Sequence, residues 1–139
     1  MAILTLKEQL IRDEENRAFV YNDSMGVPTI GVGRNLRDKG LSLLEREFLL
    51  NNDIADHTLE VCEALPWVTT LDEPRKEVLI NMSFNMGTMA LLQFVKFLAA
   101  LKAKNYLLAA MEMLDSKWAA QVGPRAHRLS QQIVLGVRQ

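Results

Sequence analysis

The sequence of 139 residues predicts a mainly α, α+β fold, with a small β-hairpin part, a long linking helix and a helical C-terminal part. Two observations carry this prediction. Apolar residues recur at helical spacing along most of the chain, in which 49% of residues are hydrophobic and only 6% are aromatic. Strand-like composition is confined to two short runs between residues 19 and 33, on either side of a turn-rich stretch. The length suits one domain with room for two lobes.

Two capping boxes mark where helices begin in the first half of the chain. The first runs from Thr5 to Glu8 and opens a helix that we expect to end near residues 15–16. The second runs from Ser42 to Glu45 and opens a long helix that ends before Pro66. We expect this long helix to link the two lobes.

A hairpin is predicted between these helices. Residues 19–21 and 27–33 are rich in β-forming side chains, and residues 22–26, Asn-Asp-Ser-Met-Gly, have turn chemistry. The pattern therefore places Asp23 at the bend. Pro28 lacks an amide hydrogen, so it favours an edge position or an unpaired face of the sheet.

The second half of the chain has the pattern of a series of helices. The first of them begins near Asp72, with Pro74 in its first turn, and ends at Gly87. Its run Val-Leu-Ile-Asn-Met-Ser-Phe is apolar nearly all round, which is typical of a buried central helix. The pattern then predicts helices over 89–103 and 106–115, a short turn over 117–120, and a last helix from Pro124 to about 134.

Charge is unevenly distributed in this chain, whose net charge is -1. Residues 1–65 carry 7 basic and 12 acidic side chains, whereas residues 66–139 carry 9 basic and 5 acidic ones. The basic excess in the second half fits either a face that meets a polyanion or a solvated helix face. Nothing in the sequence indicates nucleic-acid binding.

Cysteine and histidine are too few for a disulfide scaffold or a zinc site. Cys62 is the only cysteine, and His57 and His127 have no further ligand at metal-binding spacing, so we expect no metal and no cofactor. No apolar run reaches the length of a membrane span, and the N-terminal residues lack the basic start of a signal peptide. We therefore expect a protein made in a cytoplasm, with no exit signal of its own and no stable membrane insertion.

Two acids near the predicted hairpin suit glycoside hydrolysis, which uses one protonated and one ionised carboxyl group in different surroundings. Glu14 lies at a helix end, and Asp23 lies in a turn with many polar backbone groups. Thr29 could hold a water beside Asp23, and Gly31 and Gly33 would let a sugar approach the backbone. Spacing alone leaves a second interpretation, an acid cluster at a helix end in which either acidic neighbour of Glu14 could serve equally.

The stretch Arg12 to Asn35 resembles the signature of the phage-type lysozymes, a family of glycoside hydrolases. In that signature a Glu is followed seven residues later by a Tyr, then two later by an Asp, and six later by a Thr that opens Thr-Ile-Gly-x-Gly. Glu14, Tyr21, Asp23 and Thr29 match it without a gap. Farther along, "LINMSFNMG" is similar to the family's central helix, and "SKWAAQVGPRAHR" is similar to its C-terminal segment.

The resemblance implies a two-lobed lysozyme fold and a muramidase activity, the hydrolysis of the β-1,4 bond from N-acetylmuramic acid to N-acetylglucosamine in peptidoglycan. It implies that Glu14 is the general acid and that Asp23 is the general base or an electrostatic stabiliser. Thr29 would position the attacking water. Family members of this kind invert the anomeric centre, which requires carboxyl groups about 6.5–9.5 Å apart.

Further positions follow from the register of the resemblance. Arg125 falls where the family pairs an arginine with the catalytic Glu, and Arg128 falls where another arginine meets the preceding acid, here Asp13. The positions matching sugar contacts are Asn35, Phe84, Asn85, Phe97, Glu112, Trp118 and Gln121, although Phe97 and Glu112 differ in chemistry from the family. Core roles for Trp118 and Phe84, and a solvated basic face for the two arginines, remain alternatives.

The chain departs from the family pattern at three places. Glu15 stands where the family often has Gly, and it could act on Glu14 or face water. Arg34 stands where the family often has His, and we expect it to pair with Asp53. The stretch from Thr29 to Ser42 is short, so we expect a trimmed third strand and a smaller lobe with a more open cleft.

The resemblance also sets the expected organisation and role. We expect one lysozyme domain over residues 1–139, with a small lobe at about 13–60 and a helical lobe made of about 1–12 and 61–139. The expected partner is the glycan strand of peptidoglycan, met by a monomer. A phage or prophage endolysin would stay in the host cytoplasm until a holin gave it access to the wall, and a virion-associated lysin would look the same. A lytic transglycosylase using Glu14 alone, or an inactive glycan-binding module, are the alternatives.

Overall fold

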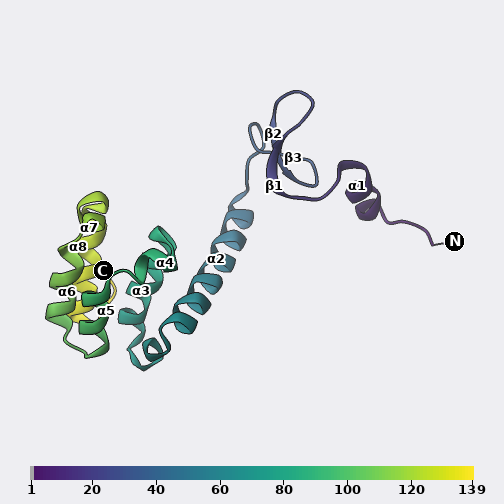
Figure 1. The fold of residues 1–139 in the computed structure, drawn as a ribbon. Coiled ribbons are helices and arrows are strands. Elements are labelled where there is room, and N and C mark those ends of the chain that lie inside the picture. The colour runs from purple at the N-terminus through teal and green to yellow at the C-terminus, as the bar shows by residue number, and fades with distance from the viewer. Residues whose placement is uncertain (1) are drawn as a thin grey trace. The chain divides into compact units, whose positions relative to one another are not determined.

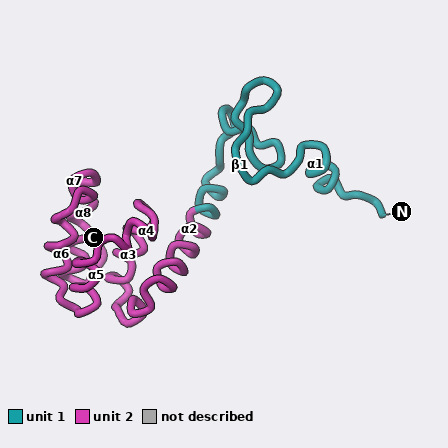
Figure 2. The backbone as a smooth tube through the Cα atoms, in the orientation of Figure 1, with its two compact units in different colours: residues 1–49 teal, residues 50–139 magenta. Residues whose placement is uncertain are grey.

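The computed structural model describes residues 2–139. The chain forms two compact units, one up to Leu49 and one from Leu50 onward (Figure 2). The first holds a helix, a small sheet and the start of a long helix, and the second holds the rest of that helix and a group of shorter ones. Helices dominate, so the predicted fold class, α+β and mainly α, is confirmed. The grouping of residues 1–12 with residues 61–139 stays a prediction.

Helix α1 (Leu6–Glu14) begins at the first predicted capping box (Figure 1). The backbone amide and the hydroxyl of Thr5 both donate to the Glu8 carboxylate, at 2.7 and 2.8 Å, and Thr5 Oγ1 accepts the Glu8 amide at 3.2 Å. The helix ends at Glu14, just before the expected end. The next residue, Glu15, turns the chain with φ 64° and ψ 166°, a conformation that is found almost only in glycine.

An antiparallel sheet follows, with strands in the order β1 (Arg17–Asn22), β2 (Pro28–Gly31) and β3 (Arg34–Asn35). Strands β1 and β2 form the predicted hairpin, and their register places Tyr21 opposite Thr29. The third strand, which we expected to be trimmed, has two residues. The sheet is therefore small, but each of its strands carries one residue of the motif: Tyr21 on β1, Thr29 on β2 and Asn35 on β3.

Pro28 lies at the first residue of β2, which is the middle strand of this sheet. The expected edge position is therefore wrong. A proline is tolerated because the strand begins at this residue, where its missing amide interrupts no established ladder. Its carbonyl still accepts the amide of Leu36 at 2.9 Å.

Helix α2 (Leu43–Ala64) begins at the second predicted capping box. The amide of Ser42 donates to the Glu45 carboxylate at 2.8 Å, and the Ser42 hydroxyl accepts the Glu45 amide at 3.2 Å. The helix ends before Pro66, as predicted, and a 3-10 turn, η1 (Pro66–Thr70), follows. Within the described residues, no helix combines the length and the hydrophobicity needed to cross a membrane.

The second unit is built from helices that pack around one apolar core. The main helices of this core are α3 (Glu73–Met86), α5 (Val95–Lys102), α6 (Tyr106–Leu114) and α8 (Pro124–Leu135). Its fully buried side chains include Leu79, Met82, Leu101, Met113 and Ile133. Helix α3 supplies two of these and contacts α8, but its residues Asn81, Phe84 and Asn85 are exposed, so it is buried on one face and not nearly all round as predicted.

The stretch predicted as one helix over 89–103 forms two helices, α4 (Thr88–Leu91) and α5. The break lies at Phe94, which has φ -79° and ψ 59°. The ring of Phe94 packs edge-on against Trp118, with centroids 6.2 Å apart. An aromatic contact from a distant part of the chain therefore accompanies an interruption that local periodicity did not predict.

The turn expected over residues 117–120 is a helix, α7 (Lys117–Val122). The hydroxyl of Ser116 accepts the amide of Ala119 at 3.1 Å, which caps the N-terminus of this helix. Gly123 ends it with a positive φ of 58°, and α8 begins at the next residue. The last helix was predicted at this position and is confirmed.

Two arginines tie α3 to the C-terminal end of the second unit. Arg138 donates to both oxygens of Glu77, at 2.7 and 2.6 Å, and these bonds lower the pKa of Glu77. Arg75 donates to the carbonyls of Ile133 and Val134, at 2.7 and 3.1 Å. It thereby satisfies carbonyl groups at the end of α8 that have no partner within the helix.

The conformation of Glu15 generates a stability prediction. We expect Glu15→Gly to raise the free energy of unfolding by about 1 kcal/mol, because relief of the strained backbone outweighs the added flexibility of the unfolded chain. Denaturant unfolding measures the change. Glu15→Ala is the matched control, since it removes the exposed ion pair of Glu15 with Arg17 but keeps Cβ. Equal stability of the Gly and Ala variants would contradict a strained backbone at this position.

Candidate active site

The carboxyl group of Glu14 lies against the backbone of Gly33. A methyl group placed on Gly33 would lie 3.0 Å from Glu14 Oε2 and 3.4 Å from its Cδ. Gly33 also has a φ of +66°, which side chains rarely adopt. The end of α1 and the turn between β2 and β3 are thus in close contact. The sequence indicated that Gly33 admits a sugar, whereas in the structure it admits the Glu14 carboxyl.

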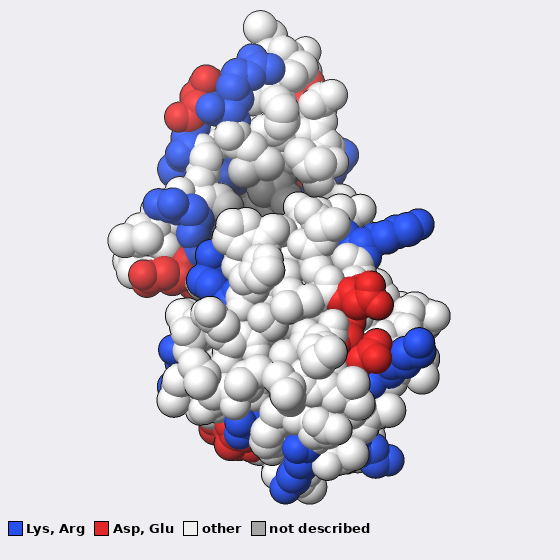
Figure 3. All heavy atoms as spheres, turned by 90° about the vertical axis from the view of Figure 1, so that its left-hand side faces the viewer, with Lys and Arg blue, Asp and Glu red and all other residues white. Residues whose placement is uncertain are grey.

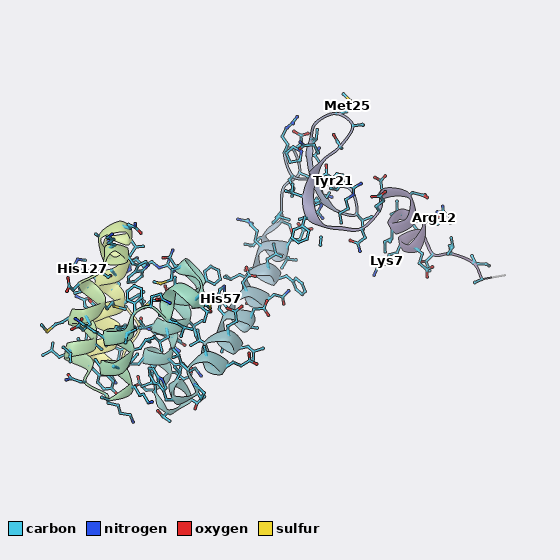
Figure 4. The ribbon with its side chains drawn as sticks, in the orientation of Figure 1. Lys7, Arg12, Tyr21, Met25, His57 and His127 are labelled. Carbon is cyan, nitrogen blue, oxygen red and sulfur yellow. The ribbon has the colours of Figure 1, made fainter. Side chains whose placement is uncertain are left out.

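Asp23 opens the bend between β1 and β2. Its Oδ1 accepts the amides of Met25 and Val27, at 2.8 and 2.9 Å, and its backbone carbonyl accepts the amide of Gly26 at 3.0 Å. Figure 4 places Met25 at the outer end of this bend. Among residues 2–139, no side chain or backbone group donates to Asp23 Oδ2. One oxygen therefore holds the turn together, and the other is available to a ligand.

Three motif residues form one row across the sheet. Tyr21 on β1 faces Thr29 on β2, and Thr29 faces Asn35 on β3. Residues directly opposite one another in an antiparallel sheet point their side chains to the same face. Figure 4 shows Tyr21 on β1, and the guanidinium of Arg17 covers its ring at 4.2 Å from the centroid. The row therefore groups Tyr21, Thr29 and Asn35 on one side of the sheet.

Thr29 and Asn35 are both held by hydrogen bonds. Thr29 is 4% exposed, and its hydroxyl donates to the carbonyl of Val27 at 2.8 Å. Since its only hydrogen is used, Thr29 Oγ1 is left as an acceptor. Asn35 accepts the amide of Asp38 at 2.8 Å and donates to the Asp38 carboxylate at 3.1 Å, so its side chain shapes the turn after β3.

Arg34 pairs with Glu45 rather than with Asp53, so the expected partner was wrong. Its two terminal nitrogens donate to the two carboxylate oxygens of Glu45, each at 2.6 Å. Glu45 lies in the first turn of α2, where the short link from β3 brings the chain, and this proximity decides the partner. The hydrogen bonds from Arg34, and next the amide of Ser42, lower the pKa of Glu45 to about 2.

The acidic neighbours of Glu14 have partners of their own. Asp13 is exposed and pairs with Arg12 at 2.8 Å. Glu15 is also exposed and pairs with Arg17 at 2.8 Å, so of the two expected roles it takes the one that faces water. The predicted pairing of an arginine with Glu14, and that of another with Asp13, remain predictions.

The aromatic candidates of the second unit differ in exposure. Trp118 is 8% exposed, and its Nε1 donates to Asn85 Oδ1 at 2.8 Å. Phe97 is 1% exposed and belongs to the core, whereas Phe84 is 41% exposed. The ring of Phe84 lies 5.4 Å from that of His57. The structure thus joins Trp118 to Asn85, leaves Phe84 open to a ligand and buries Phe97.

The polar candidates of the second unit lie in separate surroundings. Arg125 donates through Nε and Nη2 to Asn81 Oδ1, at 3.0 and 2.7 Å, and lines a hollow with Phe84. Glu112 is half-buried and lines another hollow with Phe97. Gln121 and Arg128 are exposed. The sequence did not single out Asn81 as the partner of Arg125, although it lies three residues from Phe84 on α3.

The distribution of surface charge concerns the basic excess of residues 66–139, for which the sequence left two interpretations: a face that meets a polyanion and a solvated helix face. Figure 3 shows Lys and Arg side chains interspersed with Asp and Glu side chains on the surface that faces the viewer. The basic residues on this face form no continuous patch in the described part of the chain. The choice between a face that meets a polyanion and a solvated face stays a prediction.

Glu14 lies against a glycine at a helix end and Asp23 lies in a hairpin bend, so the two acids that suit glycoside hydrolysis have different surroundings. Residues 12–132 match the family model described as phage lysozyme. The match covers most of the 139 residues. The chain belongs to the phage lysozyme family, and the resemblance seen in the sequence is confirmed.

Curated relatives place the chain beside lysozymes of the T4 type. It is 27% identical to probable T4-type lysozyme 1 of Dictyostelium discoideum, over 164 positions and 96% of each chain. It is 26% identical to probable T4-type lysozyme 2 of the same organism, over 91% of this chain and 92% of the relative. The pre-baseplate central spike protein Gp5 of Enterobacteria phage T4 is 27% identical over 96% of this chain but 28% of its own length. The first of these comparisons spans more positions than the chain has residues, so that relative carries segments that this chain lacks.

The contact between Gly33 and Glu14 predicts a selective loss of lysozyme activity. We expect Gly33→Ala to lower kcat about a hundredfold, because the new methyl group displaces the Glu14 carboxyl. Gly31→Ala is the matched control, since Gly31 has nearly the same φ, +64°, but open space where Cβ would lie. Both variants should lose stability, and kcat should fall further in Gly33→Ala. Equal kcat in the two variants would show that the contact does not matter for turnover.

Proposed function

We propose that the protein is a bacteriolytic muramidase that hydrolyses the β-1,4 bond from N-acetylmuramic acid to N-acetylglucosamine in peptidoglycan. Family membership supports the substrate and the type of reaction. The observation that carries the proposal is the contrast between the two acids. Glu14 is packed on the Gly33 backbone at a helix end, and Asp23 is fixed by amides through one oxygen only.

In this proposal Glu14 is the general acid. Its protonated carboxyl donates a proton to the glycosidic oxygen as the bond from that oxygen to the anomeric carbon breaks. The contact with Gly33 supports this role, because it limits the directions that the otherwise exposed Glu14 carboxyl can take. The ionised Glu14 would regain its proton from solvent after the products leave.

Asp23 is the proposed general base, and Thr29 helps it to hold the nucleophilic water. The water donates one hydrogen to Asp23 Oδ2 and the other to Thr29 Oγ1, which is free to accept because its own hydrogen is bonded to Val27. As the water oxygen attacks the anomeric carbon, Asp23 takes its proton. Attack from the face opposite the leaving oxygen inverts the configuration at that carbon.

We propose sugar contacts for those candidate residues whose side chains are exposed or carry a polar group. Asn35 shares a sheet row with Thr29, and Asn85, Phe84 and Gln121 are exposed in the second unit. Trp118 supports Asn85 through its hydrogen bond of 2.8 Å. Aromatic faces and amide groups are the usual partners of sugar rings and hydroxyl groups in such clefts.

We further propose that the protein acts as an endolysin, made in the host cytoplasm as a monomer and released to the wall with the help of a holin. The relative named as a central spike protein supports a second route, in which this domain would belong to a virion. A lytic activity that requires membrane permeabilisation in living cells would favour the endolysin.

Digestion of purified peptidoglycan tests the activity and its acids together. We expect wild-type protein to release fragments whose masses include a hydrolysed reducing end. Glu14→Gln should lower the rate by at least about a hundredfold, because no group then protonates the leaving oxygen, and Asp23→Ala should lose most of the activity. Glu15→Gln is the matched control, since this neighbouring acid is paired with Arg17 and should be dispensable.

Other results would select the alternatives. Fragments one water lighter, with anhydro-muramyl ends, would identify a lytic transglycosylase. Folded wild-type protein that binds glycan but releases nothing would identify a binding module. Wild-type turnover in Glu14→Gln would move the general acid to another residue.

A further inference from the structure

Arg34 and Glu45 form an ion pair, here called the clasp, that joins the two ends of the short link between the sheet and α2. The two side chains pair through two parallel bonds of 2.6 Å each, and Arg34 also donates to the carbonyl of Gly40 at 3.1 Å. Glu45 in turn accepts the amide of Ser42 at 2.8 Å. The two side chains are 28% and 37% exposed. Paired, partly shielded bonds of this kind are stronger than an ordinary surface ion pair.

The clasp is joined directly to the backbone on which Glu14 rests. Arg34 follows Gly33 in the chain, and a methyl group on Gly33 would lie 3.0 Å from Glu14 Oε2. Strand β3 has two residues, so its own pairing with β2 gives little support to this turn. Anchoring the Arg34 side chain to the first turn of α2 therefore fixes the position of the Gly33 backbone.

The clasp stays ionised over a wide range of pH. Arg34, and then the amide of Ser42, lower the pKa of Glu45 from its ordinary value of 4.5 to about 2. A lowered pKa in the folded protein means that the pair stabilises fully above pH 4.5 and is lost as the pH falls from 4.5 toward 2. Arg34 stays charged throughout, since the pair raises its pKa further.

We infer that Arg34 and Glu45 are positioning residues for the proposed general acid, acting on Glu14 through the Gly33 backbone. The inference rests on the proposed function. It assigns a role to Arg34, which stands where the family often has His, and to Glu45, which the sequence marked only as part of a capping box. Neither residue touches the substrate in this proposal.

Steady-state kinetics on soluble peptidoglycan oligomers test the inference. We expect Arg34→Ala and Glu45→Gln each to lower kcat about 10-fold to 100-fold, with KM changed by less than about 2-fold, because orientation of the acid is lost and binding is kept. The double variant should be no slower than the slower single variant, since both remove one clasp. Arg34→Lys should fall between wild type and Arg34→Ala, because lysine keeps the charge but not the paired bonds.

The matched control is the second bidentate pair of the chain, Arg138 with Glu77, whose bonds of 2.6 and 2.7 Å have nearly the same geometry. It lies in the second unit, whereas Glu14, Asp23 and Thr29 lie in the first. Arg138→Ala should lose a comparable amount of thermal stability and keep wild-type kcat. This comparison separates positioning from simple loss of an ion pair.

Each outcome decides the inference. If Arg34→Ala and Glu45→Gln keep kcat within about 2-fold of wild type, or lose no more than Arg138→Ala, the clasp is only stabilising and the inference is wrong. Circular dichroism verifies folding, and Arg34→Lys carries the test if Arg34→Ala is unfolded. One outcome would overturn the inference but leave the proposed function standing. In it the wild type is active, Glu14→Gln is inactive, and both Arg34→Lys and Glu45→Gln are fully active. An inactive wild type, or an active Glu14→Gln, would overturn the proposed function and this inference with it.

Discussion

The first unit depends on one close approach, in which the chain passes at Gly33 against the carboxyl group of Glu14. The approach requires glycine twice, because φ is +66° and because any Cβ would meet the carboxylate oxygen at 3.0 Å. It also requires α1 to end at Glu14, so that the chain can turn at once into β1. That turn places Glu15 in a strained conformation. The paired side chains of Arg34 and Glu45 hold the turn between β2 and β3. This turn supports the carboxyl group of Glu14, the proposed general acid.

The spacing of the motif follows from the geometry of the hairpin. Tyr21 and Thr29 are cross-strand neighbours, so the number of residues between them is the number that the bend needs. Asp23 opens this bend and uses one oxygen to hold it, which leaves the second oxygen close to the start of the loop. Asp23 thus has two roles. One carboxylate oxygen stabilises the turn, and the other is available for the proposed chemistry.

Elements with strong local signals were predicted, and features that depend on distant contacts were not. The capping boxes at Thr5 and Ser42 gave the starts of α1 and α2, because the bonds involved span only three residues. The break at Phe94 was missed, since it accompanies a ring contact with Trp118, and the partner of Arg34 was wrong because it depends on the path of the link to α2. The burial of Phe97 likewise follows from core packing. The candidate acids themselves came from the resemblance, since spacing alone did not separate Glu14 from its neighbours.

The central claim is that Asp23 acts on a water held with Thr29, and not as a nucleophile that bonds to the sugar. Proton NMR of the first product formed from a β-1,4-linked peptidoglycan oligomer tests it most directly, because the anomeric signal is recorded before the product equilibrates. A base acting on water predicts that the α-anomer appears first. The β-anomer appearing first would mean that configuration is retained through a covalent intermediate, and would contradict the proposed roles of Asp23 and Thr29.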